Sequence, residues 1–298
     1  MPPEQEFILP GGFFLPFPEC YNGTMEALDG KKIAAAILGR LAPLPVPKKF
    51  FGAVLVGDDA SSVSFLAQKE KIARQLGVDF RLYRFPVTVK NDELRREVGK
   101  IAEHKTCGGV IVQLPLPDHL NPHYILNAVP PEKDVDVLGE RALGSFYVGR
   151  SAVLPPAVGV MEEIFAERRI VPAEHAVAIV GLGLLVGRPI ANWIMRRAKQ
   201  TILLRRTSDI GLLCHADIVV LGTGRAGLVS PDLLKEKVGV IDFGYGTIDG
   251  KYSGDFDVRT LADGGMRTRA GSWYTPTPGG TGPILVAKLF ENFYRLNA

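Results

Sequence analysis

Short apolar runs alternate with amphipathic stretches along the first third of the chain. The runs at 51–56, 80–85 and 109–113 are mostly apolar and predict strands, the first of them buried. The stretches around and between them have helical spacing and predict helices over 33–41, 61–76 and 92–104. Gly77 follows the second of these helices as a C-terminal signal. Apolar strands separated by helices are typical of a parallel sheet that is covered on both faces.

The same alternation restarts after a segment that is rich in proline. Residues 129–140 lack a periodic pattern, and Leu154-Pro155-Pro156 marks a predicted crossing between two lobes. Beyond this crossing the pattern predicts strands at 176–180, 201–204, 217–221 and 238–242, with a helix at 186–197. A last helix over 283–296 is expected to return and pack against the first lobe.

These patterns predict an α/β protein with two lobes. We expect an N-terminal three-layer α/β substrate domain from residues 1–157 and 279–298. Residues 158–278 are expected to form a Rossmann-like, doubly wound dinucleotide-binding domain. Residues 1–24 lack a basic start and a continuous apolar segment, so they predict an irregular N-terminal arm and not a signal peptide.

Composition narrows the classes of function. The chain has 298 residues, which suits two lobes, and its 46% hydrophobic and 22% charged residues are typical of a globular protein. No apolar run reaches the length of a membrane span, and the net charge of +3 comes from interleaved signs, which argues against nucleic-acid binding. The spacing of Cys20, Cys107 and Cys214 fits neither a disulfide framework nor a zinc site, so we expect thiols in the reducing cytoplasm and no structural metal.

A glycine-rich turn joins a predicted strand to a predicted helix in the second lobe. It contains Gly181, Gly183 and Gly187, with Leu182 between the first two. Glycine allows the backbone to approach a phosphate closely, and the N-terminus of the following helix supplies oriented N–H groups. The spacing is GxGxxxG and not GxGxxG, but the strand before and the helix after favour a dinucleotide site over a purely structural turn.

Two arginines follow the next predicted strand. Sites for NAD usually place an acidic residue here to bind the ribose 2′-hydroxyl, whereas this chain has Arg205-Arg206-Thr207-Ser208. Guanidinium groups bind phosphate with two hydrogen bonds and keep their charge. The segment therefore predicts NADP, with NAD less favoured, and the alternative is a solvated basic turn.

Polar residues of the first lobe stand out against an apolar background. Lys69 shares a helix face with Phe65, Gln113 ends a very apolar strand, and Asp136 lies in an irregular loop. Each of these residues, taken alone, is more typical of a structural role than of catalysis. The loop at 275–283 combines rigid prolines with glycines that permit close backbone approach, and it is expected to lie between the lobes.

Taken together, these segments resemble the bifunctional methylenetetrahydrofolate dehydrogenase/cyclohydrolase family from about residue 29 to the C-terminus. The most specific motifs are Val56-Gly57-Asp58 with Ser62 and Lys69, the segments 112–117, 131–136, 186–189 and 278–283, and Gly254-Asp255. The resemblance implies that 5,10-methylenetetrahydrofolate is oxidised with NADP to the methenyl form, which water converts to 10-formyltetrahydrofolate. It also implies a homodimer formed through the second lobe.

The resemblance assigns roles to individual residues. Lys69 matches the lysine that transfers a proton during hydrolysis, Gln113 the glutamine that positions it, and Asp136 the aspartate that binds the pterin. The other residues predicted to bind the folate are Phe65, Val112, Leu114, Pro278, Gly279, Gly280, Thr281 and Gly282. The residues predicted to bind the cofactor are Gly181, Leu182, Gly183, Gly187, Arg205, Arg206, Thr223, Gly224 and Tyr245.

The chain departs from the family pattern near the expected site. Phe65 replaces a tyrosine, so a hydroxyl that could assist proton transfer is missing from the hydrolytic step. Val137 replaces the glycine after Asp136. Further departures are Leu182 for an arginine, Gly183 for a serine, Pro155-Pro156-Ala157-Val158 for Pro-Cys-Thr-Pro, and Tyr245 for an isoleucine. The alternatives are a dehydrogenase without cyclohydrolase activity, a catalytically silent protein that binds folate or NADP, and a dehydrogenase for another small substrate.

Overall fold

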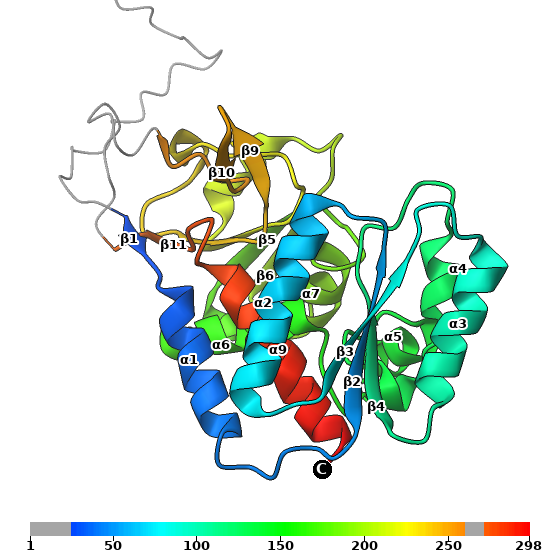
Figure 1. Ribbon diagram of the computed structural model, residues 1–298. Coiled ribbons are helices and arrows are strands. Elements are labelled where there is room, and N and C mark those ends of the chain that lie inside the picture. Colours follow the sequence, from blue (N-terminus) through cyan, green and yellow to red (C-terminus); the bar gives the residue numbers. More distant parts are fainter. Residues whose placement is uncertain (1–24, 260–270) are drawn as a thin grey trace, which may run out of the picture.

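A parallel three-stranded sheet forms the centre of the first lobe (Figure 1). The computed structural model describes residues 25–259 and 271–298. The strand order is β3 (Phe80–Phe85), β2 (Phe50–Val56), β4 (Cys107–Val112). All seven residues of β2 are buried, as expected for the central strand of a covered sheet. The crossover helices are α2 (Ala60–Leu76) and α3 (Asn91–Glu103).

Local sequence signals fix the ends of α2. The Asp59 carboxylate accepts a hydrogen bond of 2.8 Å from the Ser62 backbone N–H, which caps the first turn. Gly77 ends the helix in the left-handed conformation with φ of 72°, which favours glycine. The predicted helix at 61–76 is therefore confirmed. Its capped start holds Phe65 and Lys69 at fixed places along the helix.

A second parallel sheet forms the other lobe. In the described residues its strand order is β1 (Glu26–Ala27), β11 (Trp273–Tyr274), β8 (Gly239–Asp242), β7 (Ile218–Leu221), β5 (Ala176–Val180), β6 (Gln200–Leu204). Both β6 and β7 pair with β5, so β5 lies between them in the sheet. The loop that follows β5 therefore lies between the loops that follow β6 and β7. Such an arrangement of strand ends is where doubly wound sheets bind ligands.

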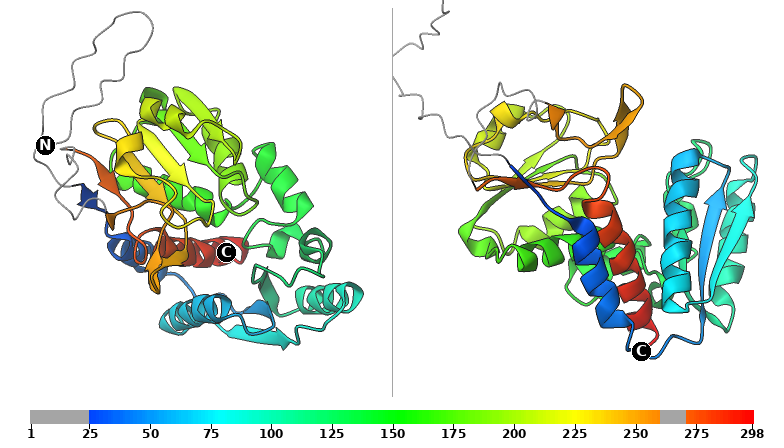
Figure 2. Two further views of the ribbon diagram at one scale, coloured as in Figure 1. Left: turned by 90° about the horizontal axis from the view of Figure 1, so that it is seen from above. Right: turned by 60° about the vertical axis from the view of Figure 1, so that its left-hand side comes forward.

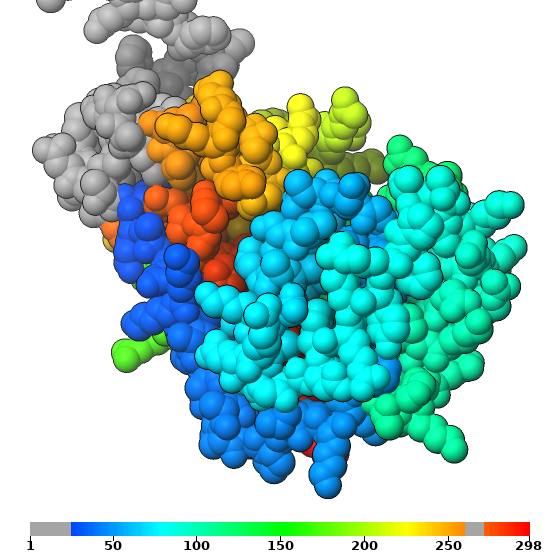
Figure 3. Space-filling model, in the orientation of Figure 1, coloured from blue at the N-terminus to red at the C-terminus, as the bar shows by residue number. Residues whose placement is uncertain are grey.

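Three helices connect the lobes. They are α1 (Gly30–Leu41), α6 (Pro156–Glu167) and α9 (Thr281–Leu296). Figure 2 shows α1 and α9 side by side, and α9 also packs against α6 and α2. On the face shown in Figure 3 only small parts of α9, in red, reach the surface. The predicted return of the last helix to the first lobe is confirmed.

Aromatic packing joins α9 to the first sheet. Phe51 of β2 stacks on Phe293 with ring centroids 4.8 Å apart, and Phe290 meets Phe51 edge to face at 5.5 Å. Asn292 donates hydrogen bonds to the backbone carbonyls of Val135 and Leu154. Because these groups are buried, the helix and the loops that it contacts form one core.

Several elements differ from the expectation. The helix predicted at 186–197 is α7, Gly187–Ile194, and its predicted last turn is irregular. The sequence analysis predicted neither the helices α4 (Pro122–Leu126), α5 (Glu140–Tyr147) and α6, nor the short strands β1 and β11, nor the antiparallel hairpin of β9 (Gly246–Ile248) and β10 (Lys251–Ser253). The expected division at residues 157 and 279 stays a prediction, although β1, from the predicted first domain, pairs within the second sheet.

Further expectations concern membranes, metals and thiols. Within residues 25–259 and 271–298, no helix has the length and apolarity required to cross a membrane. The same residues hold no group of three or more metal-binding side chains. Cys107 is a buried free thiol and Cys214 an exposed one, whereas Cys20 and the predicted arm at 1–24 lie outside the described residues.

Candidate functional site

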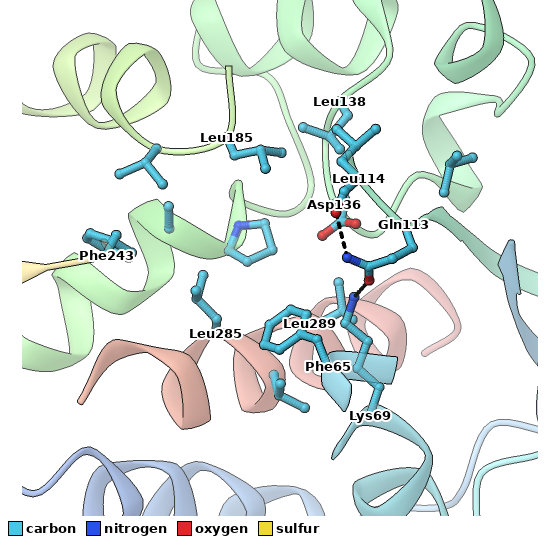
Figure 4. A pocket seen from close by; sticks show the side chains of 15 residues that line it. Phe65, Lys69, Gln113, Leu114, Asp136, Leu138, Leu185, Phe243, Leu285 and Leu289 are labelled. Carbon is cyan, nitrogen blue, oxygen red and sulfur yellow. Dashed lines mark hydrogen bonds between the residues drawn. The ribbon is translucent and has the colours of Figure 1, made fainter. Parts of the chain in front are cut away.

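A cavity lies between the lobes, and residues from both line it (Figure 4). The first lobe contributes α2 and the segments after β4, and the second contributes the glycine-rich turn and the end of β8. The lining residues are Phe65, Lys69, Val112, Gln113, Leu114, Asp136, Leu138, Pro156, Ala157, Leu185, Val186, Phe243, Leu285, Val286 and Leu289. The cavity therefore combines a few polar groups with a mostly apolar wall, as small-molecule sites usually do.

Lys69 and Gln113 form a buried hydrogen-bonded pair in this wall. The Lys69 Nζ donates to the Gln113 Oε1 at 2.9 Å, and the Gln113 Nε2 donates to the Leu114 carbonyl at 2.7 Å. The second bond fixes the orientation of the amide, because its nitrogen is already engaged. Figure 4 shows both side chains converging with Asp136 at one end of the cavity. Gln113 thus presents only its oxygen to the lysine.

Burial changes the proton affinity of these groups. Lys69 is only 5% exposed, and burial lowers the pKa of its amine, an effect that the nearby Asp136 partly opposes. Burial raises the pKa of Asp136, and Lys69 opposes that shift. The Lys69 Nζ also lies 4.7 Å from the centroid of the Phe65 ring. Lys69 is therefore an amine that loses its proton more readily than an exposed lysine.

The loop that carries Asp136 is held in its shape by the carboxylate of Asp134. The Asp134 Oδ2 accepts backbone hydrogen bonds from Leu138 at 2.9 Å and Gly139 at 2.8 Å. Burial raises the pKa of Asp134 to about 7. Val137 directly follows Asp136, has a φ of 56° and is only 1% exposed. A β-branched residue is rare in this left-handed conformation. The loop therefore keeps the backbone shape that glycine would favour while it buries an apolar side chain.

A second cavity of about 670 Å³ opens at the glycine-rich turn. Its lining residues are Val180, Gly181, Gly183, Leu204, Arg205, Arg206, Ser208, Ile210, Gly222, Thr223, Arg225 and Leu228. A Cβ at Gly187 would lie 1.8 Å from the Gly181 carbonyl oxygen, and Gly181 has φ of 90°. The turn is thus close-packed on itself, and the volume suits a cofactor site. Among the described residues that line it, arginines are present and carboxylates are absent.

Buried carboxylates hold the loops around this second cavity. The Asp255 Oδ2 accepts hydrogen bonds from the Thr223 backbone N–H at 2.6 Å and from the Thr223 Oγ1 at 2.8 Å. The Thr223 Oγ1 in turn accepts from the Arg225 backbone N–H at 3.1 Å. Asp255 is fully buried. The turn after β7 is therefore fixed by one side chain that never reaches solvent.

Asp242, at the end of β8, anchors the proline-glycine loop. Its backbone carbonyl accepts a hydrogen bond of 2.8 Å from the Thr281 Oγ1, and its backbone N–H donates to the Thr275 Oγ1 at 2.7 Å. Burial raises the pKa of Asp242 to about 6. This loop precedes α9, whose Leu285 and Leu289 line the first cavity.

Not every predicted residue lines one of these two cavities. Lys69, Gln113, Asp136, Phe65, Val112 and Leu114 lie together around the first, and Gly181, Gly183, Arg205, Arg206 and Thr223 around the second. The remaining predicted residues line neither cavity: Leu182, Gly187, Gly224, Tyr245, Pro278, Gly279, Gly280, Thr281 and Gly282. Tyr245 stacks instead on Tyr252 of the hairpin, with centroids 4.9 Å apart. The roles of all the predicted site residues, including those that line a cavity, stay predictions.

Two groups of lining residues were not predicted. The apolar wall of the first cavity comes from α6, α9 and the glycine-rich turn, which carry no polar signal in the sequence. Arg225 lines the second cavity after β7, and only the pairing of β7 with β5 brings it there. Its sequence signal is a basic residue within Gly222-Thr223-Gly224-Arg225-Ala226-Gly227, a second glycine-rich turn that follows an apolar strand.

Comparisons with known proteins cover both lobes. Residues 28–136 match the catalytic domain of tetrahydrofolate dehydrogenase/cyclohydrolase, and residues 155–298 match its NAD(P)-binding domain. The bifunctional protein FolD of Halothermothrix orenii is 34% identical over 280 residues, covering 90% of this chain and 96% of that protein.

Solved structures show the same arrangement. The bifunctional enzyme FolD (methylenetetrahydrofolate dehydrogenase/cyclohydrolase) from Campylobacter jejuni superposes with a TM-score of 0.83 at 28% identity, covering 92% of this chain and 99% of that one. The Trypanosoma brucei enzyme, solved with NADP cofactor and inhibitor, also gives 0.83 at 25% identity, with 92% and 98% covered. By these matches to both domains, the chain belongs to the tetrahydrofolate dehydrogenase/cyclohydrolase family.

Proposed function

We propose that the protein oxidises 5,10-methylenetetrahydrofolate to the 5,10-methenyl form with NADP and hydrolyses that product to 10-formyltetrahydrofolate, as part of one-carbon metabolism. The observation that carries the proposal is the buried Lys69 amine, held by Gln113 in a cavity that both lobes line. A lysine with a lowered pKa is suited to proton transfer at neutral pH. The family supports both steps.

The second cavity fits NADP. Gly181 and Gly183 of the glycine-rich turn line it, so a diphosphate could be bound next to the start of α7, and Arg205 and Arg206 offer guanidinium groups for a 2′-phosphate. The Trypanosoma brucei relative is solved with that cofactor. When bound, NADP accepts a hydride from the one-carbon bridge of the folate. Leu185 and Val186 line the folate cavity from the cofactor lobe, so the turn borders both ligands.

The hydrolytic step requires one proton acceptor. The oxygen of water forms a bond to the methenyl carbon and loses a proton to the Lys69 Nζ. The bond from that carbon to one ring nitrogen then breaks, the hydroxyl proton passes to that nitrogen, and the formyl group remains on the other. Gln113 keeps the amine aimed at the reacting carbon, and the Asp136 carboxylate binds the pterin edge by accepting hydrogen bonds from its N–H groups. Phe65 contributes its ring face and no hydroxyl.

The test follows absorbance with 5,10-methylenetetrahydrofolate, first with NADP and then with NAD, and afterwards follows the decay of the methenyl product. Lys69→Met keeps the length of the side chain and removes the amine. We expect it to slow methenyl decay by about 100- to 10,000-fold. NADP binding by the same variant is expected to stay within about threefold. Methenyl decay at the wild-type rate in Lys69→Met would overturn the assigned role, and hydride transfer without accelerated decay in the wild type would leave a dehydrogenase only.

Assembly and location complete the proposal. We propose a homodimer formed through the second lobe, as the family resemblance implies, and light scattering on the purified protein gives the mass that tests it. A cytoplasmic location accords with Cys107 and Cys214, which are free thiols.

A further inference from the structure

Three arginines surround the second cavity, and they come from two different loops. Arg205 and Arg206 follow β6, whereas Arg225 follows β7. Because β5 lies between β6 and β7 in the sheet, these loops stand on opposite sides of the glycine-rich turn that follows β5. A ligand seated on that turn therefore has guanidinium groups on two sides.

The loop that carries Arg225 has a fixed backbone. Thr223 accepts a hydrogen bond from the Arg225 N–H and is itself held by the buried Asp255 carboxylate through two bonds. The Arg205 backbone is held similarly, since its N–H donates to the Ser208 Oγ at 3.0 Å. Fixed backbones lower the ordering cost of two long side chains that meet one ligand.

The charge of this cavity is unbalanced. No carboxylate is among the described residues that line it, so an anionic ligand would meet the three guanidinium groups without competition from an acidic side chain. The diphosphate of a dinucleotide belongs at the start of α7, where backbone N–H groups receive it. A further phosphate on the adenosine ribose is the group that remains for the arginines. Leu182, which stands where the family can have an arginine, supplies no charge from the turn itself.

We propose that Arg225 is a specificity-determining residue that binds the 2′-phosphate of the cofactor together with Arg205, from the opposite side. This inference rests on the proposed use of NADP. It assigns part of the preference for NADP to a loop outside the β6 end, where cofactor preference in doubly wound sheets is usually determined.

The experiment measures binding of 2′,5′-ADP and 5′-AMP by calorimetry, without folate or turnover. Both probes carry the 5′-phosphate, and only the first carries the 2′-phosphate. We expect Arg225→Ala and Arg205→Ala each to weaken 2′,5′-ADP by about 10-fold or more and to leave 5′-AMP within about threefold, since a charge-assisted hydrogen bond is lost in each case. Arg225→Lys is expected to fall between Arg225→Ala and the wild type, because it keeps the charge and loses the planar fork.

The control is Arg196→Ala, an exposed arginine after α7 that lines neither cavity, and it is expected to bind both probes as the wild type does. Equal weakening of both probes in Arg225→Ala would overturn the inference, because the residue would then contact the adenine or the 5′-phosphate. Unchanged binding of 2′,5′-ADP by that variant would also overturn it. Wild-type protein that does not distinguish the two probes would overturn the proposed NADP preference as well, so the two failures are separable.

Discussion

A methyl group at Gly187 would disrupt the turn between β5 and α7. An alanine Cβ there would lie 1.8 Å from the Gly181 carbonyl oxygen and 2.9 Å from the Leu182 Cα. Non-bonded carbon atoms prefer about 3.5–4.0 Å, and the contact with the oxygen is far shorter than this, so one of the two backbone segments must shift by about 1.5 Å. Both contacts are with backbone atoms, so no flexible side chain can yield. The start of α7 then moves away from the position in which its N–H groups receive the cofactor diphosphate.

A shift of this size breaks one or two of the charge-assisted hydrogen bonds from these N–H groups to the diphosphate, each worth about 1.5–3 kcal/mol. We therefore expect Gly187→Ala to raise the Kd for NADP about 100-fold, equivalent to about 2.8 kcal/mol. Calorimetric titration with NADP measures this, and a thermal melt verifies that the variant is folded. Gly39→Ala serves as the control, because nothing lies within 4 Å of its Cβ and it sits inside α1. If folded Gly187→Ala binds NADP within threefold of the wild type, the close packing of the turn does not determine cofactor affinity.

Three other residues give predictions of the same kind. The pKa of Asp134 is raised from 3.8 to about 7, so the stability that its neutral form contributes is complete below about pH 4. This contribution, at most about 4 kcal/mol, is lost as the pH rises to about 7. Urea unfolding between pH 5 and 8 is expected to show the loss, and Asp134→Asn should flatten it. Val137→Gly relieves about 1–2 kcal/mol of backbone strain, but it loses about 1.5–3 kcal/mol from the buried side chain and about 0.5–1 kcal/mol from the added backbone flexibility of glycine. We therefore expect a lower urea midpoint of unfolding, and a higher midpoint would mean that the strain dominates. Phe65→Tyr restores a hydroxyl beside Lys69 and is expected to speed methenyl decay in the absorbance assay; an unchanged rate would show that the hydrolytic step does not need that group.

Much of the fold is predictable because its signals are local. Buried strands such as β2 and β5 are unbroken apolar runs, and α2 has both a cap and a terminating Gly77. The β9–β10 hairpin was missed although Asp249-Gly250 carries the sequence of a two-residue turn, and both residues have positive φ. Its strands of three residues with mixed polarity give no periodicity. Strands β1 and β11 are still shorter, and they pair with each other although most of the chain lies between them, so no short stretch of sequence contains the pattern of both.

The candidate site likewise has a part that local sequence predicts and a part that it does not. Lys69 and Gln113 were predicted from motifs, and their hydrogen bond agrees with the predicted positioning of one by the other. The apolar wall could not be predicted, since Leu285 and Leu289 look like any other core residues of a helix. Arg225 was not predicted because its position at the second cavity depends on the order of the strands in the sheet. That order follows from the packing of the whole sheet and from no single segment.

The position of α9 determines when the first lobe can fold. Residues 281–296 cover Phe51 of β2 and pack against α1, although more than 200 residues separate them from either element. Contacts so distant in sequence carry a large loop-closure cost and form late. During synthesis the face of the first sheet that α9 covers therefore has only α2 packed against it until the second lobe and α9 have been made. The first lobe is translated early and completed last, which makes the nascent chain dependent on protection of that face.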